Sequence, residues 1–309
     1  MKKILITGGA GFIPSCLADS LIEDKENFVV MVDNFLTGDK KNLPSTKKKN
    51  WRFIKADVNK YADISAIMLA HSFDYVFHYA AVVGVQRTLA NPVMVLEDIQ
   101  GIKNILDLCK STGVKRIFYS SSSEVYGEPV EFPQNEHTTP LNSRLPYAIV
   151  KNVGESFLKS YQLEFGLDYT IFRFFNTYGP KQSTDFVMSK FIRAALKHRD
   201  ITVYGDGKQT RTFCFIDDNI EATTTAFLGN KFVNDVINIG SDNEITILEL
   251  AREVIKATKS KSKIVHLPAL KEGDMTRRKP DISNMRELLK RDLLPMKNGI
   301  RKLIDSGNF

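Results

Sequence analysis

Short apolar runs alternate with segments of helical periodicity over the first two thirds of the chain. The runs are rich in Val, Ile, Phe and Tyr, which predicts buried strands. The segments between them repeat apolar residues every three or four positions, as from Val95 to Cys109, which predicts amphipathic helices. The predicted strands cover residues 3–7, 28–33, 52–56, 74–79, 115–121 and 168–174.

This alternation predicts an α/β fold with a doubly wound parallel sheet of the Rossmann type, because strands joined by helices form right-handed βαβ units. Beyond about residue 180 the order changes to a helix at 186–198, a short strand at 202–204 and a glycine-rich turn. The segment ending at Asn238 is expected to return to the main sheet as a strand. We therefore expect a dinucleotide-binding domain and a smaller mixed α/β substrate domain. The first comprises residues 1–180 and about 213–240, and the second 181–212 and 241–309.

Composition places the chain among ordinary globular proteins, with 43% hydrophobic and 26% charged residues. No apolar run is long enough to cross a bilayer, and the N-terminal run stops at Thr7, too early for a signal peptide. Three scattered cysteines indicate a reducing compartment. These features predict a cytoplasmic protein with no membrane partner.

The net charge of +7 does not predict a nucleic-acid partner, because the basic residues are dispersed. The one dense cluster, Lys47 to Lys49, is typical of a solvated loop. An excess of positive charge also suits a small anionic substrate.

A glycine turn follows the first predicted strand and opens a helix, with Gly8 and Gly11 where backbone N–H groups can approach a pyrophosphate. Asp33 lies 22 residues after Gly11 and ends the second strand, where a carboxylate accepts both ribose hydroxyls and repels a 2′-phosphate. The pattern predicts NAD as the cofactor, with Asp57 and Val58 beside the adenine ring. The residues expected to bind it are Gly8, Gly11, Phe12, Ile13, Asp33, Asn34, Asp57, Val58, Tyr147 and Lys151.

Two features mark a catalytic centre. Tyr147 and Lys151 are four residues apart, hence on one face of a helix, where an ammonium group favours the phenolate. The fifth strand ends in a serine run followed by Glu124, at the sheet edge where ligands of such folds bind. A phenolate and the Ser122 hydroxyl could together take the proton of a sugar hydroxyl while hydride leaves for NAD.

These residues resemble the extended short-chain dehydrogenase/reductases, in particular the nucleotide-sugar epimerases, dehydratases and decarboxylases. The resemblance rests on five ordered motifs over nearly the whole chain. They are Thr7-Gly8-x-x-Gly11, Ser122 before Val125-Tyr126-Gly127, Tyr147-x-x-x-Lys151, Phe175-Asn176-x-Tyr178-Gly179-Pro180 and Val203-Tyr204-Gly205-Asp206-Gly207.

The resemblance implies a recycled NAD and a Ser122/Tyr147/Lys151 triad. No metal is expected, since the scattered cysteines do not form a metal-binding pattern. The resemblance also implies a nucleotide diphosphate held by Asn176 and Arg211, with Arg278 nearby. Tyr204 corresponds to a residue that packs near the nucleotide base of the substrate. A surface salt bridge is the alternative interpretation for Arg277 and Arg278. A homodimer is implied, through helices at about 93–112 and 147–165.

Two positions depart from the pattern. Pro14 stands where a third small residue normally lets helix and strand pack closely, although proline is tolerated in a first helical turn. Asp98 stands where the family usually has asparagine. Both departures concern the binding of NAD.

The family implies oxidation at the sugar C4 hydroxyl, and the later steps depend on other residues. Ser123 replaces the acid that a 4,6-dehydratase needs. Glu124 and the Arg278-Lys279-Pro280-Asp281-Ile282 segment resemble those of UDP-glucuronate decarboxylases, whereas residues 80–85 resemble epimerases. The balance favours a UDP-hexose 4-epimerase, with the decarboxylase as the alternative. A non-catalytic NAD-binding regulator would usually lack the tyrosine and lysine.

Overall fold

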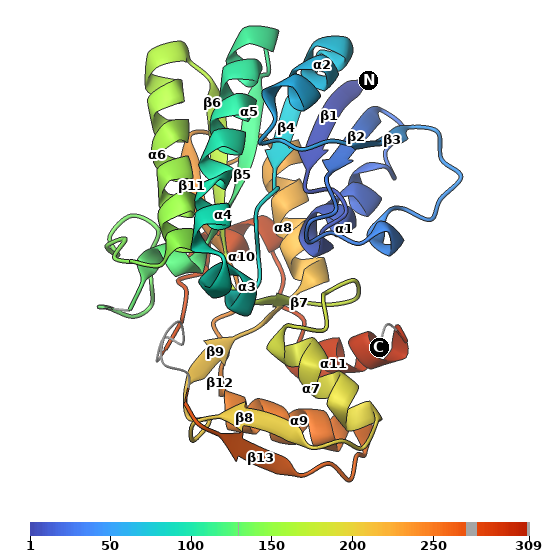
Figure 1. Cartoon of the computed structure of the whole chain (residues 1–309), viewed down its shortest axis with the longest axis vertical. Coiled ribbons are helices and arrows are strands. Elements are labelled where there is room, and N and C mark those ends of the chain that lie inside the picture. The colour runs from blue at the N-terminus through green and yellow to red at the C-terminus, as the bar shows by residue number, and fades with distance from the viewer. Residues whose placement is uncertain (129, 270–276, 308–309) are drawn as a thin grey trace. The chain divides into compact units, whose positions relative to one another are not determined.

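The computed structural model describes residues 1–128, 130–269 and 277–307 (Figure 1). The chain divides into two compact units. Unit 1 comprises Met1–Val125, Ser143–Arg173 and Thr223–Ile237, and unit 2 comprises Tyr126–Asn142, Phe174–Ala222 and Asn238–Phe309. This division is based on compactness alone. That one domain binds the dinucleotide and the other the substrate therefore stays a prediction.

A seven-stranded parallel sheet forms the centre of unit 1, in the order β11-β6-β5-β4-β1-β2-β3. β1 pairs in parallel with both β2 and β4, so the strand order reverses beside β1, where open α/β sheets bind ligands. β1 contains the unbroken apolar run Ile4 to Ile6 and β2 the run Phe28 to Val32, because both faces of the sheet are covered. The strands are β1 (Lys2–Thr7), β2 (Asn27–Asp33), β3 (Trp51–Lys55), β4 (Tyr75–His78), β5 (Arg116–Ser122), β6 (Asp168–Phe174) and β11 (Asp235–Ile239).

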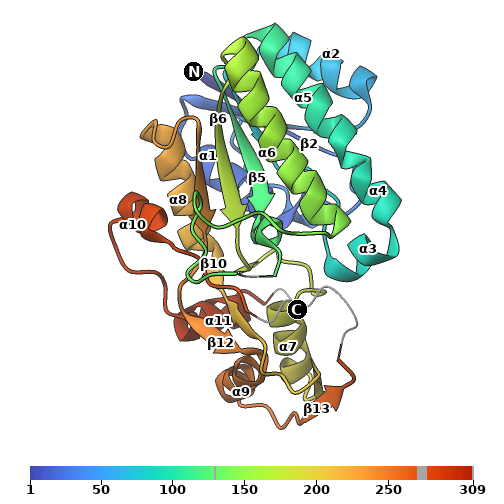
Figure 2. The same cartoon turned by 90° about the vertical axis from the view of Figure 1, so that its left-hand side faces the viewer.

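Helices cover both faces of this sheet, as the doubly wound pattern requires. Figure 2 shows α5 and α6 on one face and α1 and α8 on the other. The helices are α1 (Phe12–Leu21), α2 (Tyr61–His71), α3 (Val85–Ala90), α4 (Pro92–Leu96), α5 (Asp98–Thr112), α6 (Pro146–Phe165) and α8 (Ile216–Leu228), with 3₁₀ turns η1 (Lys40–Asn42) and η2 (Ser123–Tyr126).

Unit 2 is built from short two-stranded sheets and helices. β8 pairs in parallel with β13, β7 with β10, and β9 pairs antiparallel with β12. The elements are β7 (Thr177–Tyr178), α7 (Val187–Leu196), β8 (Ile201–Tyr204), β9 (Thr210–Thr212), β10 (Cys214–Phe215), β12 (Glu244–Thr246), α9 (Ile247–Thr258), β13 (Ile264–Leu267), α10 (Ser283–Leu289) and α11 (Met296–Asp305).

The structure confirms the predicted Rossmann sheet, with each of the six expected strands present. It also confirms that a strand ending at Asn238 and Ile239 returns to the main sheet, where β11 lies at the edge beside β6. The helix expected at 186–198 is α7. Within the described ranges, no helix combines the length and apolar character needed to cross a membrane.

Candidate active site

The glycine turn between β1 and α1 is closely packed. Gly8 has a positive φ of 71°, and a Cβ there would lie 2.9 Å from the backbone of Ala80. A side chain on Gly11 would crowd the Gly8 carbonyl oxygen at 3.0 Å. The helix then begins at Phe12 with Gly11 as its N-cap. The N–H groups of Gly9, Ala10 and Gly11 bond to Val32, Asp33 and Gly8. The N–H groups of the first turn of α1, which have no intrahelical partner, are therefore the ones that suit a bound pyrophosphate.

Pro14 lies inside the first turn of α1, and the helix forms around it as expected. Its ring packs on the turn, since a Cβ on Gly11 would lie 3.2 Å from Pro14 Cγ. The missing N–H of proline belongs to a position that has no intrahelical partner in any case.

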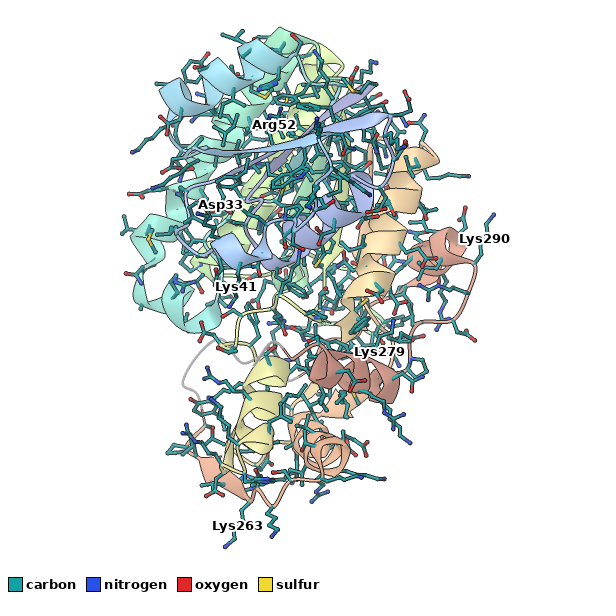
Figure 3. All side chains as sticks on the ribbon, turned by 90° about the vertical axis from the view of Figure 1, so that its right-hand side faces the viewer. Asp33, Lys41, Arg52, Lys263, Lys279 and Lys290 are labelled. Atoms are coloured by element: carbon teal, nitrogen blue, oxygen red, sulfur yellow. The ribbon has the colours of Figure 1, made fainter. Side chains whose placement is uncertain are left out.

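Asp33 ends β2 directly beside the glycine turn. Its Oδ2 accepts the N–H of Ala10 at 3.0 Å, and its Oδ1 accepts that of Phe35 at 2.7 Å. Burial raises the pKa of this carboxyl, and the two backbone hydrogen bonds oppose that rise. Gly38 also faces the carboxylate, because a Cβ there would lie 2.8 Å from Oδ2. Figure 3 labels Asp33 in unit 1, with Lys41, which pairs with Asp39 at 3.1 Å.

The other residues expected at the adenosine end follow β2 and β3. The carboxyl ends of these strands are adjacent, since Asp33 pairs in register with Lys55. Asn34 is exposed, and Asp57 accepts the N–H of Asn59 at 3.0 Å. The carbonyl of Val58 accepts a hydrogen bond from Asn104 Nδ2 at 2.9 Å. These residues fit a dinucleotide lying across the carboxyl ends of the strands.

Lys151 is a buried ammonium group on α6. The helix begins at Pro146, a residue suited to the first helical position, so Tyr147 and Lys151 fall one turn apart on the same face. Lys151 Nζ donates to Ser120 Oγ at 3.3 Å and lies 5.8 Å from the centre of the Tyr147 ring. Burial lowers the pKa of Lys151 to about 8, while Asp98 and Glu155 act to raise it. A cation held this close favours the phenolate form of Tyr147.

Ser122 is the last residue of β5, and Glu124 follows it in η2. The Ser122 hydroxyl accepts the N–H of Glu124 at 3.2 Å. Ser122 is buried and Glu124 is half-buried. The strand tip thus carries a hydroxyl and, two residues on, a carboxylate, and β5 also places Ser120 against Lys151 on α6.

Asp98 begins α5 and anchors the loop after β4. Its Oδ2 accepts the N–H of Val82 at 2.7 Å. Burial raises the pKa of Asp98, while this hydrogen bond and the charge of Lys151 lower it. An asparagine could accept the same hydrogen bond, so the residue present here adds a negative charge to the surroundings of Lys151.

In unit 2 the structure brings together two of the residues expected at the diphosphate. Asn176 Nδ2 donates to the carbonyl of Thr212 at 3.4 Å, so it lies against the strand that carries Arg211. Arg211 is buried and donates to the carbonyl of Thr210 at 2.7 Å. Tyr204 ends β8, and its carbonyl accepts a hydrogen bond from Gln209 at 3.3 Å.

The neighbouring arginines differ in surroundings. Arg277 forms two hydrogen bonds with Glu244, at 2.5 and 2.7 Å, and lies over the ring of Phe132. The surface salt bridge, which was the alternative interpretation for this arginine, is therefore present at Arg277. Arg278 is only 6% exposed. It lies in a segment whose residue Pro280 bridges the backbone of Gln134.

Sequence reasoning missed the buried polar groups near Lys151, one of the residues predicted to be catalytic. Thr7 Oγ1 accepts the N–H groups of Tyr79 and Ala80, each at 3.1 Å, which leaves its proton for His78 Nδ1 at 2.8 Å. Burial lowers the pKa of His78 to about 3, so its ring is neutral. A single histidine inside an apolar run has no spacing that could have indicated this. In the part of the chain that the structure describes, no cluster of His, Cys, Asp and Glu is arranged to hold a metal.

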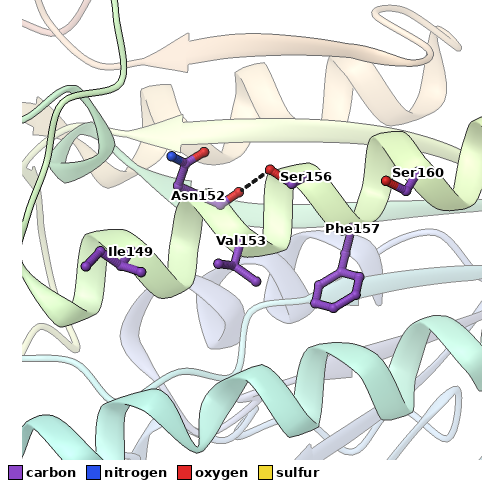
Figure 4. Close-up of a pocket in the computed structure, with 6 residues that line it drawn as sticks. All are labelled: Ile149, Asn152, Val153, Ser156, Phe157 and Ser160. Carbon is purple, nitrogen blue, oxygen red and sulfur yellow. Dashed lines mark hydrogen bonds between the residues drawn. The ribbon is translucent and has the colours of Figure 1, made fainter.

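The outer face of α6 is partly apolar and carries a shallow pocket (Figure 4). In this close-up Ser156 donates to the carbonyl of Asn152. Ile149 is 40% exposed. The residues that line the pocket are Ile149, Asn152, Val153, Ser156, Phe157 and Ser160.

Comparison with known proteins identifies a matching family and similar proteins in sequence and in structure. The profile of the NAD dependent epimerase/dehydratase family matches residues 4–240. The UDP-N-acetyl-alpha-D-glucosaminuronate decarboxylase of Bacillus cytotoxicus is 38% identical over 301 residues, which are 93% of this chain and 91% of that protein.

Among solved structures, the UDP-glucose 4-epimerase of Thermotoga maritima with UDP-glucose superposes with a TM-score of 0.92 at 30% identity, covering 98% of this chain and 97% of the other. The UDP-glucuronic acid 4-epimerase of Bacillus cereus, in complex with UDP-glucuronic acid and NAD, gives 0.90 at 29% identity and 98% of both chains. The sequence relative named here is thus a decarboxylase, and the two solved structures named here are 4-epimerases.

Proposed function

This chain belongs to the NAD dependent epimerase/dehydratase family, and from that premise we propose that it decarboxylates a UDP-linked hexuronate through a transient 4-keto sugar. The family relationship confirms that the chain is an enzyme of the NAD-dependent epimerase/dehydratase family and that its cofactor is NAD, whereas the epimerase reaction expected from the sequence stays a prediction. The observation that carries the catalytic part of the proposal is the buried Lys151 ammonium beside the ring of Tyr147.

In the proposed reaction Tyr147 is the general base for the C4 hydroxyl. Lys151 stabilises the phenolate, and Ser122 shares the hydroxyl proton. Bound NAD supplies the capacity to accept hydride from C4 and to return it. Gly8, Gly11 and Asp33 would hold the dinucleotide through its pyrophosphate and ribose.

Oxidation at C4 makes the uronate a β-keto acid. The bond between C5 and the carboxyl carbon then breaks, carbon dioxide leaves, and the electron pair forms the C4–C5 enolate. Protonated Tyr147 and the Lys151 ammonium stabilise the negative oxygen, in the manner of preorganised electrostatic catalysis. C5 takes up a proton, and reduction of the ketone completes the cycle.

The choice of decarboxylation is supported by two observations. Glu124 follows the Ser122 hydroxyl in η2, as in the decarboxylases that the sequence resembles. The curated relative at 38% identity also acts, by its name, on a UDP-linked uronate. We propose that Asn176 and Arg211 hold the diphosphate, with Arg278 and Tyr204 also in the substrate site, since a guanidinium fork matches phosphate oxygens.

A UDP-sugar 4-epimerase, which the sequence favoured, is the second candidate. Residues 80–85 and the superposition with the Thermotoga maritima epimerase support it. In that reaction the keto sugar turns over and hydride returns to its opposite face. The two candidates share every step up to the ketone, so the residues proposed for oxidation are the same.

We further propose that the protein is a cytoplasmic homodimer. The three cysteines are free thiols, as expected in a reducing compartment. The outer face of α6, with its half-exposed apolar side chains, is the surface proposed for pairing.

Product analysis tests the reaction. The protein is incubated with NAD and, separately, with UDP-glucuronate, UDP-N-acetylglucosaminuronate, UDP-glucose and UDP-N-acetylglucosamine, and the products are identified by mass and NMR. We expect a UDP-linked uronate to lose carbon dioxide. A product of unchanged mass with inverted C4 would replace the decarboxylase with the epimerase, and no turnover of any of the four would refute both.

A further inference from the structure

A buried ion pair lies one helical turn beyond Lys151 on α6. Arg173 donates through Nε to Glu155 Oε1 at 3.0 Å and through Nη2 to Oε2 at 2.7 Å. The two side chains are 2% and 1% exposed. A buried pair of this kind often stabilises a protein no more than apolar side chains of the same size, so stability alone does not explain it.

The pair is joined to the strand that carries Ser122. Ser121 Oγ donates to Glu155 Oε1 at 2.5 Å. The Glu155 carboxylate therefore receives hydrogen bonds from β5 and from β6 while its backbone belongs to α6. It connects three elements at one point.

Three consecutive residues of β5 contact the same side of α6. Tyr119 packs on Gly154, where a Cβ would overlap the tyrosine hydroxyl. Ser120 accepts the hydrogen bond of Lys151, and Ser121 donates to Glu155. A shift of α6 along β5 by one residue would break all three contacts.

We propose that Glu155 is a positioning residue of the reaction. Through Ser121 and Arg173 it fixes the register of α6 on β5 that brings Tyr147 and Lys151 to Ser122. This inference rests on the proposed function, because it assigns Glu155 a role in that reaction.

The negative charge of Glu155 also supports the proposed reaction, because it favours the protonated form of Lys151. Lys151 is faced by Asp98 from α5, by Glu155 and the Tyr147 ring from its own helix, by the Tyr119 ring from β5 and by the neutral His78 from β4. Of these groups, the two carboxylates raise the pKa of Lys151 and so help to keep the ammonium charged. Loss of Glu155 removes one of the two.

Two variants test the proposal without leaving a buried charge uncompensated. Ser121→Ala removes one hydroxyl, and the double variant Glu155→Met/Arg173→Leu replaces the pair with apolar side chains, a change that buried pairs often tolerate. For both we expect kcat to fall about tenfold or more with KM within about twofold, since small misplacements of catalytic groups are costly. Only the double variant should also move the alkaline limb of the pH profile to lower pH. Ser111→Ala, an exposed serine of α5, is the control and should behave as wild type.

A second measurement separates this proposal from the proposed function. Amide hydrogen exchange in the first two turns of α6 should be about tenfold faster in Ser121→Ala than in Ser111→Ala if this contact holds the register. Wild-type kcat in both test variants, or unchanged exchange, would overturn the role of Glu155. Absence of turnover in the wild type would refute the proposed function, while the exchange measurement would still test the register.

Discussion

At the residue scale the proposed mechanism depends on the Lys151 ammonium group, which must stay protonated although it is buried. Desolvation lowers the pKa of Lys151 to about 8, and Asp98 opposes this. The ammonium is present below its pKa and is lost above it. The pH range of activity therefore reports on the carboxylates around Lys151.

Asp98→Asn is expected to move the alkaline limb of the kcat/KM profile to lower pH. Asparagine can still accept the N–H of Val82, so the loop after β4 keeps its anchor while the negative charge is removed. The measurement is kcat/KM against pH with a saturating concentration of NAD. Glu97→Gln, at the exposed position next to it, should leave the limb in place. An alkaline limb that stays in place, or moves to higher pH, in Asp98→Asn would contradict this account of Lys151.

At the element scale the position of α6 on β5 determines where Tyr147 and Lys151, the residues proposed for catalysis, lie. Gly154 lets the helix approach Tyr119 at a point where any other residue would overlap the ring. The hydroxyl of Tyr119 is buried and has no hydrogen-bond partner among the described residues, so packing decides this contact.

Gly154→Ala tests that close approach. Helix propensity alone favours alanine over glycine by roughly 1 kcal/mol. The overlap with Tyr119 should reverse the sign, and we expect a net loss of about 1–3 kcal/mol in the free energy of unfolding, as for other overpacked sites. Urea unfolding measures it, with Lys159→Ala on the exposed side of α6 as control. A stabilised Gly154→Ala protein would show that α6 is free to move away from β5.

At the scale of the whole molecule the outer face of α6 is the surface proposed for dimerisation. Ile149→Glu places a charge in that face, at a position 40% exposed in the single chain. A charge buried without a partner in an interface is strongly unfavourable. We expect wild type to sediment as a dimer of the 34.9 kDa chain and Ile149→Glu as a folded monomer. Lys256→Glu, at an exposed position of α9, should remain dimeric, and a dimeric Ile149→Glu would exclude the α6 face.

Much of the central sheet could be predicted, because β1 to β6 are apolar runs that alternate with segments of helical periodicity in the sequence. Short strands such as β7 and β10, of two residues each, have no period to detect and depend on tertiary pairing. The glycine turn, Asp33 and the Tyr147–Lys151 pair could be singled out as candidates because the chemistry proposed for them requires fixed spacings. Glu155 and Arg173 were missed, since a charged residue in the sequence usually indicates solvent, and only the fold shows that these two meet in the core.

The central claim is that Tyr147, tuned by Lys151, removes the proton from the sugar hydroxyl. The most direct test compares turnover of UDP-glucuronate, labelled with ¹³C at C6, by wild type, Tyr147→Phe and the control Tyr161→Phe. Tyr161 is on the same helix as Tyr147, and its hydroxyl donates to Asp107 of α5. We expect labelled carbon dioxide from wild type and Tyr161→Phe, and a rate at least about 100-fold lower from Tyr147→Phe, the scale of a lost general base. Release by Tyr147→Phe at the wild-type rate would contradict the claim.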